Sequence, residues 1–362
     1  MTDTKPKTKP KTDTGTPSPA PAERDVLAVA SQSGPTITFF DALDFRRLGV
    51  LEVPSEPHEL CFDPVRRRLY ATITYRSGYY HANGGRAHEL VVIDPDRRRI
   101  LDVVDLAPER APHGIALDPS GGLLWVSVEG DDDGGEGALV ALDTDSLEPV
   151  RRLPVGAPGP HWFALAPDGS RAYTANKEAP FLSVLGTGKD GPAAGRIPVP
   201  GSEGIAVSRD GRFVYAAAPK GDFTLAGPVR GAGVRVVDTA TGAVVRTHRT
   251  DGFVFPVHVT ATDLVLAGEL RMRAGGPELG TQAPGLLRVY DGQGAERGTV
   301  EVGAFPLTIT SSPDGARGYV AAVSSSTVTV VDLVRMEAVA TLVVDRAGEP
   351  GAHGLAYIPR LR

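Results

Sequence analysis

Residues 113–155 contain four apolar runs in a fixed order: His113-Gly-Ile-Ala-Leu-Asp, Leu123-Leu-Trp-Val-Ser-Val, Ala138-Leu-Val-Ala-Leu-Asp and Val150-Arg-Arg-Leu-Pro-Val. The runs are rich in Val, Ile, Leu and aromatic residues, and they alternate with a period of two residues. They are bounded by Gly, Pro and Asp, as in Pro119-Ser-Gly-Gly after the first run. This pattern is typical of β-strands joined by tight turns. The stretch therefore predicts one unit of four antiparallel strands.

The unit recurs along the chain at intervals of 42 to 55 residues, and a period of this length with four strands per unit is typical of a β-propeller. The units begin near His58, His113, His161, Glu203, His258, Leu307 and His353. An aromatic residue stands twelve positions after the start in five of them, where we expect it to pack between neighbouring blades: Tyr70, Trp125, Tyr173, Tyr215 and Tyr319.

The two ends of the chain complement each other. The N-terminal stretch has strand-like runs at 26–30, 36–40 and 46–53 but lacks an inner strand, whereas residues 353–358 are an inner strand without partners. Together they would form one blade and leave no free sheet edge. The prediction is an all-β, seven-bladed β-propeller with four antiparallel strands per blade. It forms one domain at 25–362, after a disordered polar tail at 1–24.

Composition excludes several classes of function. The chain has 44 Asp+Glu against 38 Lys+Arg, so no basic surface favours nucleic acid. No run of 18 apolar residues could span a membrane, and the N-terminus does not resemble a signal or transit peptide, so we expect a cytoplasmic protein. A phosphate-binding glycine loop, a Gly-x-Ser-x-Gly elbow and a CxxC pair are all missing. A small-molecule substrate remains as the expected partner, with the oligomeric state left open.

Five of the eight histidines stand at the start of a unit: His58, His113, His161, His258 and His353. Equivalent positions of propeller blades lie around a common axis, so we expect these imidazoles to face one another. Neutral imidazole is a good ligand for Zn, Cu, Fe or Ni and a poor one for Mg or Ca. The sequence therefore predicts one transition metal ion on the axis, with Fe or Cu favoured and Zn or Mn possible. In the alternative interpretation, each histidine separately caps a strand with a hydrogen bond.

Three carboxylates are expected beside the histidines. Glu129 and Glu269 end second strands, at the same face of the ring as the unit starts, and Glu203 replaces histidine in the fourth unit. A carboxylate near a metal-bound imidazole can ligate the metal, orient the ring or act as a general base. We therefore predict catalytic or orienting roles for these three residues.

Long loops are expected over the same face, at 75–88, 219–233 and 269–285. Propeller hairpins need only two to five residues, so loops of this length are often functional. Their aromatic and cationic side chains would suit a lid over an organic, anionic substrate. The candidate lid residues, with Lys177 at the end of a second strand, are Tyr75, Tyr79, Tyr80, Lys177, Arg271 and Arg273.

Two resemblances bear on these expectations. Repeats such as Gly204-Ile-Ala-Val-Ser-Arg-Asp-Gly-Arg-Phe-Val-Tyr-Ala-Ala-Ala resemble the YVTN family of seven-bladed propellers over residues 26–359, which implies the fold but not a function. Pro112-His-Gly-Ile and Trp125-Val-Ser-Val-Glu are similar to the motifs that carry the catalytic histidines and glutamates of the virginiamycin B lyases. His258 and Glu269 look like a second such pair.

The lyase resemblance implies Mg²⁺ and a C–O elimination, but three further axial histidines depart from it. Carotenoid-cleaving oxygenases, which hold iron on a seven-bladed axis with four histidines, are similar in architecture alone. Three hypotheses follow. The first is a metal-dependent oxidoreductase acting on a small organic substrate of specialised metabolism. The second is a metal-dependent lyase or isomerase, and the third is a non-enzymatic propeller that binds a ligand or peptide.

Overall fold

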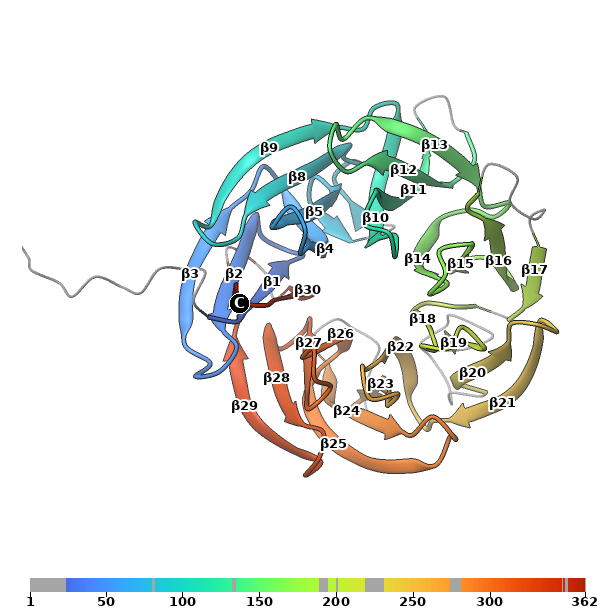
Figure 1. Cartoon of the computed structure of the whole chain (residues 1–362). Helices are drawn as coiled ribbons and strands as arrows, with labels where there is room; N and C mark the ends of the chain where they lie inside the picture. Colours follow the sequence, from blue (N-terminus) through green and yellow to red (C-terminus); the bar gives the residue numbers. More distant parts are fainter. Residues whose placement is uncertain are drawn as a thin grey trace, which may run out of the picture.

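A computed structural model describes residues 24–79, 82–131, 135–188, 195–199, 201–218, 231–273, 281–346, 348 and 351–361. These residues form seven four-stranded antiparallel sheets, which are arranged as blades around a central axis (Figure 1). The predicted all-β, seven-bladed propeller is therefore confirmed. Within the same residues, no helix is long and apolar enough to cross a membrane.

Each blade runs from an inner strand at the axis to an outer strand at the rim. The first three complete blades comprise β4 (Glu56–Asp63), β5 (Arg68–Tyr75), β8 (Glu89–Asp94) and β9 (Arg99–Asp105); β10 (Glu109–Leu117), β11 (Leu123–Asp131), β12 (Ala138–Asp143) and β13 (Pro149–Pro154); and β14 (Pro160–Leu165), β15 (Arg171–Asn176), β16 (Phe181–Gly186) and β17 (Gly195–Pro198). A small hairpin of β6 (Gly78–Tyr79) and β7 (Ala82–Asn83) extends from the first of these blades.

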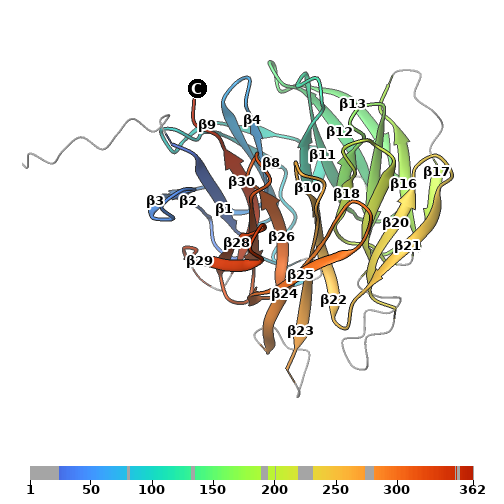
Figure 2. The ribbon, with the colours of Figure 1, turned by 60° about the horizontal axis from the view of Figure 1, so that its bottom comes forward.

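The next three blades have the same strand order. They comprise β18 (Ile205–Val207), β19 (Phe213–Ala218), β20 (Gly233–Asp238) and β21 (Ala243–Arg249); β22 (Phe253–Val259), β23 (Val265–Met272), β24 (Gln282–Tyr290) and β25 (Glu296–Ala304); and β26 (Pro306–Ser311), β27 (Arg317–Ala322), β28 (Thr327–Asp332) and β29 (Glu337–Val343). Along the axis, the inner strands lie at the centre and the outer strands form the rim (Figure 1), and an oblique view shows β10, β26 and β30 in the middle of the ring (Figure 2).

The seventh blade joins the two ends of the chain, as predicted. It consists of β3 (Arg47–Glu52), β2 (Thr36–Asp41), β1 (Val26–Ser31) and the C-terminal β30 (Ala352–Ile358). Antiparallel pairing of β1 with β30 runs from Val26–Ile358 to Ser31–Ala352. The C-terminal strand thus supplies the inner edge of the blade that the N-terminal strands begin.

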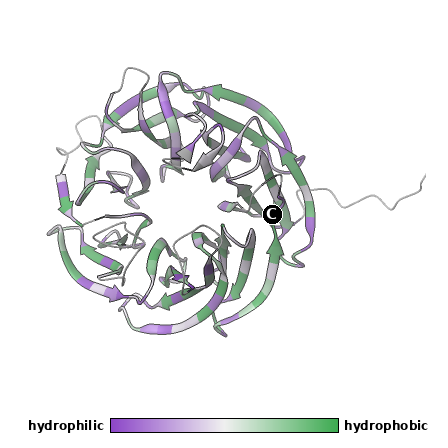
Figure 3. Cartoon of the chain, turned by 180° about the vertical axis from the view of Figure 1, so that it is seen from behind, coloured by the Kyte–Doolittle hydropathy of each residue, from purple (hydrophilic) through white to green (hydrophobic). Residues whose placement is uncertain are grey.

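Burial follows the position of each strand in its blade. All residues of β1 and β2 are buried, whereas the residues of the outer strand β3 are exposed or half-buried. The strands of the ring carry hydrophobic segments interrupted by polar ones (Figure 3). Apolar clusters lie between adjacent blades: Tyr70 packs with Leu124 and Val126 of the next blade, and Trp125 packs with Phe163 of the one after. The recurring aromatic residue thus packs between blades, as expected.

Ring closure gives a first testable prediction. Deletion of residues 352–362 removes β30 and exposes the hydrogen-bonding edge of β1, so we expect unfolding or aggregation. Deletion of residues 1–22, which precede the first strand, is the matched control and should leave the melting temperature unchanged. Thermal unfolding and size-exclusion chromatography of both truncations check this. Equal melting temperatures for the two truncations would contradict closure through β30.

Candidate functional site

A β-bulge near the start of the inner strand turns one side chain of a blade towards the axis. In β10, Pro112 pairs with Val128 and Ile115 pairs with Val126, so His113 and its neighbour form the bulge. The equivalent bulges of β4, β14 and β30 present His58, His161 and His353. Bulges re-aim side chains and are frequent next to active sites.

Hydroxyl groups of second strands hold these bulges in place. The Thr72 hydroxyl donates to the carbonyl of His113 at 2.8 Å, and the Ser127 hydroxyl donates to the carbonyl of His161 at 2.6 Å. Ser127 also accepts a hydrogen bond from the backbone N–H of Gly114. The bulges of β10 and β14 are thus bonded to the preceding blade, which links the positions of His113 and His161 to their neighbours in the ring.

Four imidazoles from four consecutive blades form a contiguous row. The ring centroids of His353 and His58 are 4.1 Å apart, those of His58 and His113 are 3.8 Å apart, and those of His113 and His161 are 3.8 Å apart. All four side chains are buried. His58 Nδ1, His113 Nδ1 and His353 Nε2 are buried ring nitrogens without a hydrogen-bond partner.

A carboxylate stands at each end of this row. At one end, Glu59 Oε1 lies 3.2 Å from His353 Nδ1 and 3.6 Å from His58 Nδ1. At the other end, Glu203 Oε2 lies 3.2 Å from His161 Nδ1. A carboxylate that accepts from one ring nitrogen orients the imidazole and makes the other nitrogen a better metal ligand.

Sequence reasoning missed Glu59 and its partner Trp162. Both are the second residue of a bulge, and the Trp162 indole Nε1 donates to Glu59 Oε1 at 2.7 Å. Glu59, His58 and His353 present ligand atoms that all lie within 4.8 Å of one another. The signal in the sequence was the carboxylate directly after His58, where other units have Gly114 and Gly354.

Burial determines the protonation states in this cluster. Burial and then the charge of His353 lower the pKa of His58 to about 4. Burial is also the largest cause that lowers the pKa values of His113 and His161 well below the usual range. Burial raises the pKa of Glu59, but the charges and hydrogen bonds of His353 and His58 together outweigh it and bring the pKa to about 2. Neutral imidazoles of His58, His113 and His161 beside an ionised Glu59 form a donor set that suits a cation.

The histidine row lines a cavity of about 280 Å³ on the axis. Seven of its lining residues come from the axial positions of the seven blades: His58, His113, His161, Glu203, Phe255, Leu307 and His353. The remaining lining residues are Gln32, Tyr75, Lys177, Phe305 and Val323. Six of the seven unit starts that the sequence predicted therefore meet at this cavity.

The prediction that His258 faces the axis was wrong, because the bulge of its strand lies three residues earlier than expected. In β22 the bulge falls between Val254, which pairs with Glu269, and Val257, which pairs with Ala267, so Phe255 takes the axial position. His258 lies three residues further along the strand, where its Nε2 is 2.9 Å from the Ser311 hydroxyl of the next blade. It is not among the residues that line the axial cavity.

Glu269 is also displaced from the axis, because it stands one residue out of register with Glu129. Glu269 pairs with Val254, as Val128 pairs with Pro112, and successive strand residues point to opposite faces. Its carboxylate accepts hydrogen bonds from the Arg288 guanidinium and from the backbone N–H of Gly252. These contacts give Glu269 a structural environment within its own blade.

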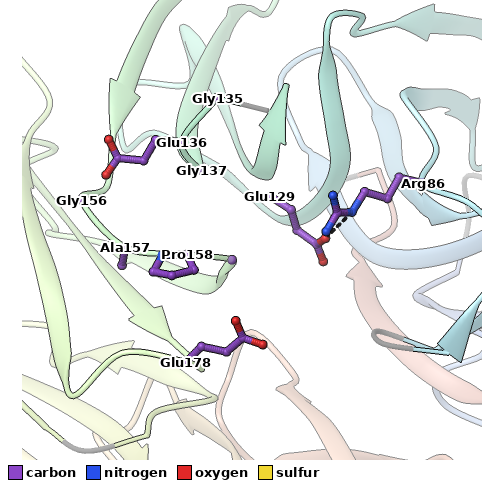
Figure 4. A pocket seen from close by; sticks show the side chains of 10 residues that line it. Arg86, Glu129, Gly135, Glu136, Gly137, Gly156, Ala157, Pro158 and Glu178 are labelled. Carbon is purple, nitrogen blue, oxygen red and sulfur yellow. Dashed lines mark ion pairs between the residues drawn. The ribbon is translucent and has the colours of Figure 1, made fainter. Parts of the chain in front are cut away.

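Glu129 lies beside the cavity, not on its wall. It accepts a hydrogen bond from the Tyr75 hydroxyl and forms an ion pair with Arg86 at 2.9 Å. Burial is the largest influence on Glu129 and raises its pKa. The carboxylate faces a separate groove of about 470 Å³, together with Glu136 and Glu178 (Figure 4). Tyr75 therefore connects the axial cavity to this acidic groove.

The predicted lid residues have different locations. Tyr75 and Lys177 line the cavity, and Lys177 Nζ lies 3.1 Å from Glu203 Oε1. Arg271 and Arg273 do not line it: Arg271 donates to the Pro284 carbonyl and pairs with Glu301 at the blade edge, and Arg273 is exposed. Tyr79 ends the short strand β6, and Tyr80 lies outside the described residues.

Comparison with known proteins identifies similar folds. No family model and no curated sequence matches the chain. Hydrazine synthase of Kuenenia stuttgartiensis is 17% identical with a TM-score of 0.60, over 80% of this chain and 86% of that one. A functionally unknown protein from Desulfotomaculum acetoxidans is 11% identical with a TM-score of 0.68, over 94% and 100%. The dihydro-heme d1 dehydrogenase NirN is 16% identical with a TM-score of 0.57, over 91% and 66%. At these identities the likeness extends to the fold alone.

The bulge geometry predicts that Gly354 cannot carry a side chain. A Cβ at this position would overlap the carbonyl oxygen of His58, whereas a Cβ at Gly122 would meet only the Ser120 hydroxyl at 3.5 Å. Gly354→Ala should lower stability by about 1–3 kcal/mol, while Gly122→Ala should change it by less than about 0.5 kcal/mol. Chemical unfolding of the two variants measures the difference. Equal stabilities would refute the close packing of β30 against β4.

Proposed function

We propose that the protein is a metal-dependent enzyme that binds one transition metal ion between His58, His113, His161 and His353 and acts on a small organic substrate in the adjoining cavity. The observation that carries this proposal is the convergence of four buried imidazoles from four blades. The ring nitrogens His58 Nδ1, His113 Nδ1 and His353 Nε2 are costly to bury unless a ligand compensates them.

The donor set favours Fe or Cu, with Zn or Mn as further candidates, because neutral imidazoles select these metals over Mg and Ca. Glu59 and Glu203 would orient His353 and His161 through the ring nitrogens that face them. Such a metal would supply Lewis-acid or redox chemistry at the cavity wall. With this number of imidazoles, we propose oxidoreductase activity. The enzymes among the similar folds are loosely compatible with it.

One observation favours a second candidate, a metal-dependent lyase or isomerase. Tyr75 lines the cavity and its hydroxyl donates to Glu129, so a proton could pass between a substrate and the acidic groove. In that case Glu129→Gln should keep its metal and lose turnover by about 10²–10⁴-fold. A non-enzymatic propeller that binds a ligand at the same cavity is the third candidate. It would bind a ligand without converting it.

Metal content tests the proposal directly. Protein purified without a His-tag and reconstituted with Fe, Cu, Mn or Zn should bind about one equivalent, measured by elemental analysis. His113→Ala and His353→Ala should lower occupancy sharply. His248→Ala and His258→Ala are the matched controls, because His248 stacks on Tyr290 and His258 bonds to Ser311 away from the cavity. Wild-type protein that retains less than about a tenth of an equivalent would remove the proposal.

The orienting role of Glu59 can be tested by comparing two glutamate variants. Glu59→Gln retains the shape of the side chain but loses the charge that holds His353, so metal affinity should fall by about 10–100-fold. Glu269→Gln is the control, because it removes a buried carboxylate that contacts Arg288 instead of a histidine. Competition with a chelator measures both affinities. An equal loss in the two variants would show a general effect on stability and not an orienting role.

A further inference from the structure

The axial residues divide the cavity into a polar half and an apolar half. Going around the ring from β30, four consecutive blades contribute histidines, and the next contributes Glu203. The last two blades contribute Phe255 and Leu307. The residues at the ends of second strands follow the same division, since Lys177 lies on the polar side and Val323 on the apolar side. A ligand in this cavity therefore meets different chemistry at its two ends.

Side chains that pack against one another form the wall of the apolar half. Phe255 and Phe305 are in contact, with ring centroids 5.3 Å apart and planes at 60°. They belong to one apolar cluster, to which Leu307 also packs. Phe305 has a φ of 62°, a conformation that bulky side chains rarely adopt, and its carbonyl accepts a hydrogen bond from the N–H of Val323. Ala111, Gly159 and Gly201 have a positive φ at the same place, two residues before the axial residue of their blades, so this conformation is a feature of the repeat.

The polar half presents a cation to the cavity. Among the described residues that line it, Lys177 carries the positive charge, and its side chain is 19% exposed. Glu203, its partner at 3.1 Å, also faces His161 and is 1% exposed. An ammonium group donates up to three hydrogen bonds, so it can bond Glu203 and an anionic ligand together. The described residues of the apolar half, Phe255, Phe305, Leu307 and Val323, offer no comparable partner for a charge.

The volume limits the ligand. A cavity of about 280 Å³ corresponds to roughly nine water molecules. This space is below the usual range for drug-sized ligands, and it fits one ring with a short side chain.

We propose that the substrate is a small organic acid with an aromatic-sized apolar body, bound with its carboxylate at Lys177 and its body against Phe255, Phe305 and Leu307. This inference rests on the proposed function, because it places the substrate between the apolar wall and the histidine row that would hold the metal. It assigns recognition of the acid to Lys177 and recognition of the body to the phenylalanine pair.

Three probes of one shape test the assignment: 3-phenylpropionate, 3-phenylpropionamide and 3-phenylpropan-1-amine. Isothermal titration calorimetry is run on metal-loaded and on metal-free protein, with metal content measured in each sample. The acid should bind at least about tenfold more tightly than the amide, because charge-assisted hydrogen bonds are the stronger ones. The amine should bind more weakly than the amide.

Two kinds of variant test the polar half and the apolar half of the cavity separately. Lys177→Met, and the double variant Lys177→Met with Glu203→Gln, should reduce the preference for acid over amide to less than about threefold. The double variant leaves no unpaired buried carboxylate, so it tests recognition even if the single variant is unstable. Phe255→Ala or Phe305→Ala should weaken both probes about tenfold and keep the ratio. Arg297→Met, at an exposed ion pair with Asp291, should change neither the affinities for the probes nor their ratio.

The outcomes distinguish this inference from the proposed function. Suppose that the metal binds fully. The inference is then overturned, and the metal enzyme stands, if acid and amide bind equally, if the amine binds best, or if no probe binds at about 10 mM. If no metal binds but the acid preference persists and depends on Lys177, the inference holds and the proposed function fails. A preference that survives both Lys177 variants also overturns the inference.

Discussion

The β-bulge near the start of an inner strand determines which side chains reach the axis of this propeller. A regular strand would alternate its side chains between the two faces of the blade and bury both against neighbouring blades. The bulge inserts an extra residue, so one side chain, such as His113, turns out of the blade towards the axis. The hydroxyls of Thr72 and Ser127 bond the bulged backbone to the adjacent blade, and Gly354 allows β30 to approach His58. The positions of the four histidines are thus a property of the ring as a whole.

Most of the axial positions could be predicted, because the sequence indicates where each bulge lies. In three blades a proline directly precedes the axial histidine, and the recurring aromatic residue fixes the distance to the second strand. The fifth unit breaks the rule, because Pro256 follows the axial residue Phe255 instead of preceding it. Aligning that unit on its proline and histidine moved the register by three residues and led to His258. A bulge adds one residue to one strand, so register beyond it cannot be counted from the sequence alone.

The contacts between blades were less predictable. Glu59 and Trp162 are separated by 103 residues in the chain, and only the closed ring brings their side chains together. Similarly, Glu129 and Glu269 end comparable strands in the sequence, but a difference of one residue in pairing sends them to opposite faces. Sequence periodicity defines the blade in which a residue lies. It does not define the partner that the residue meets across the axis.

The fold is pseudo-symmetric, but the chemistry of its axis is not. Neighbouring imidazoles in the row are 3.8–4.1 Å apart, while His58 and His161, which are separated by one blade, are already 6.1 Å apart. Imidazoles that are to share one ion must therefore come from a contiguous group of blades and not from positions spread around the whole ring. Grouping four histidines on one side leaves the opposite blades free to carry Phe255 and Leu307, so one small cavity holds both a polar cluster and an apolar wall. A symmetric set of seven histidines would offer more nitrogen donors than an ion can use and no surface to hold the body of a substrate.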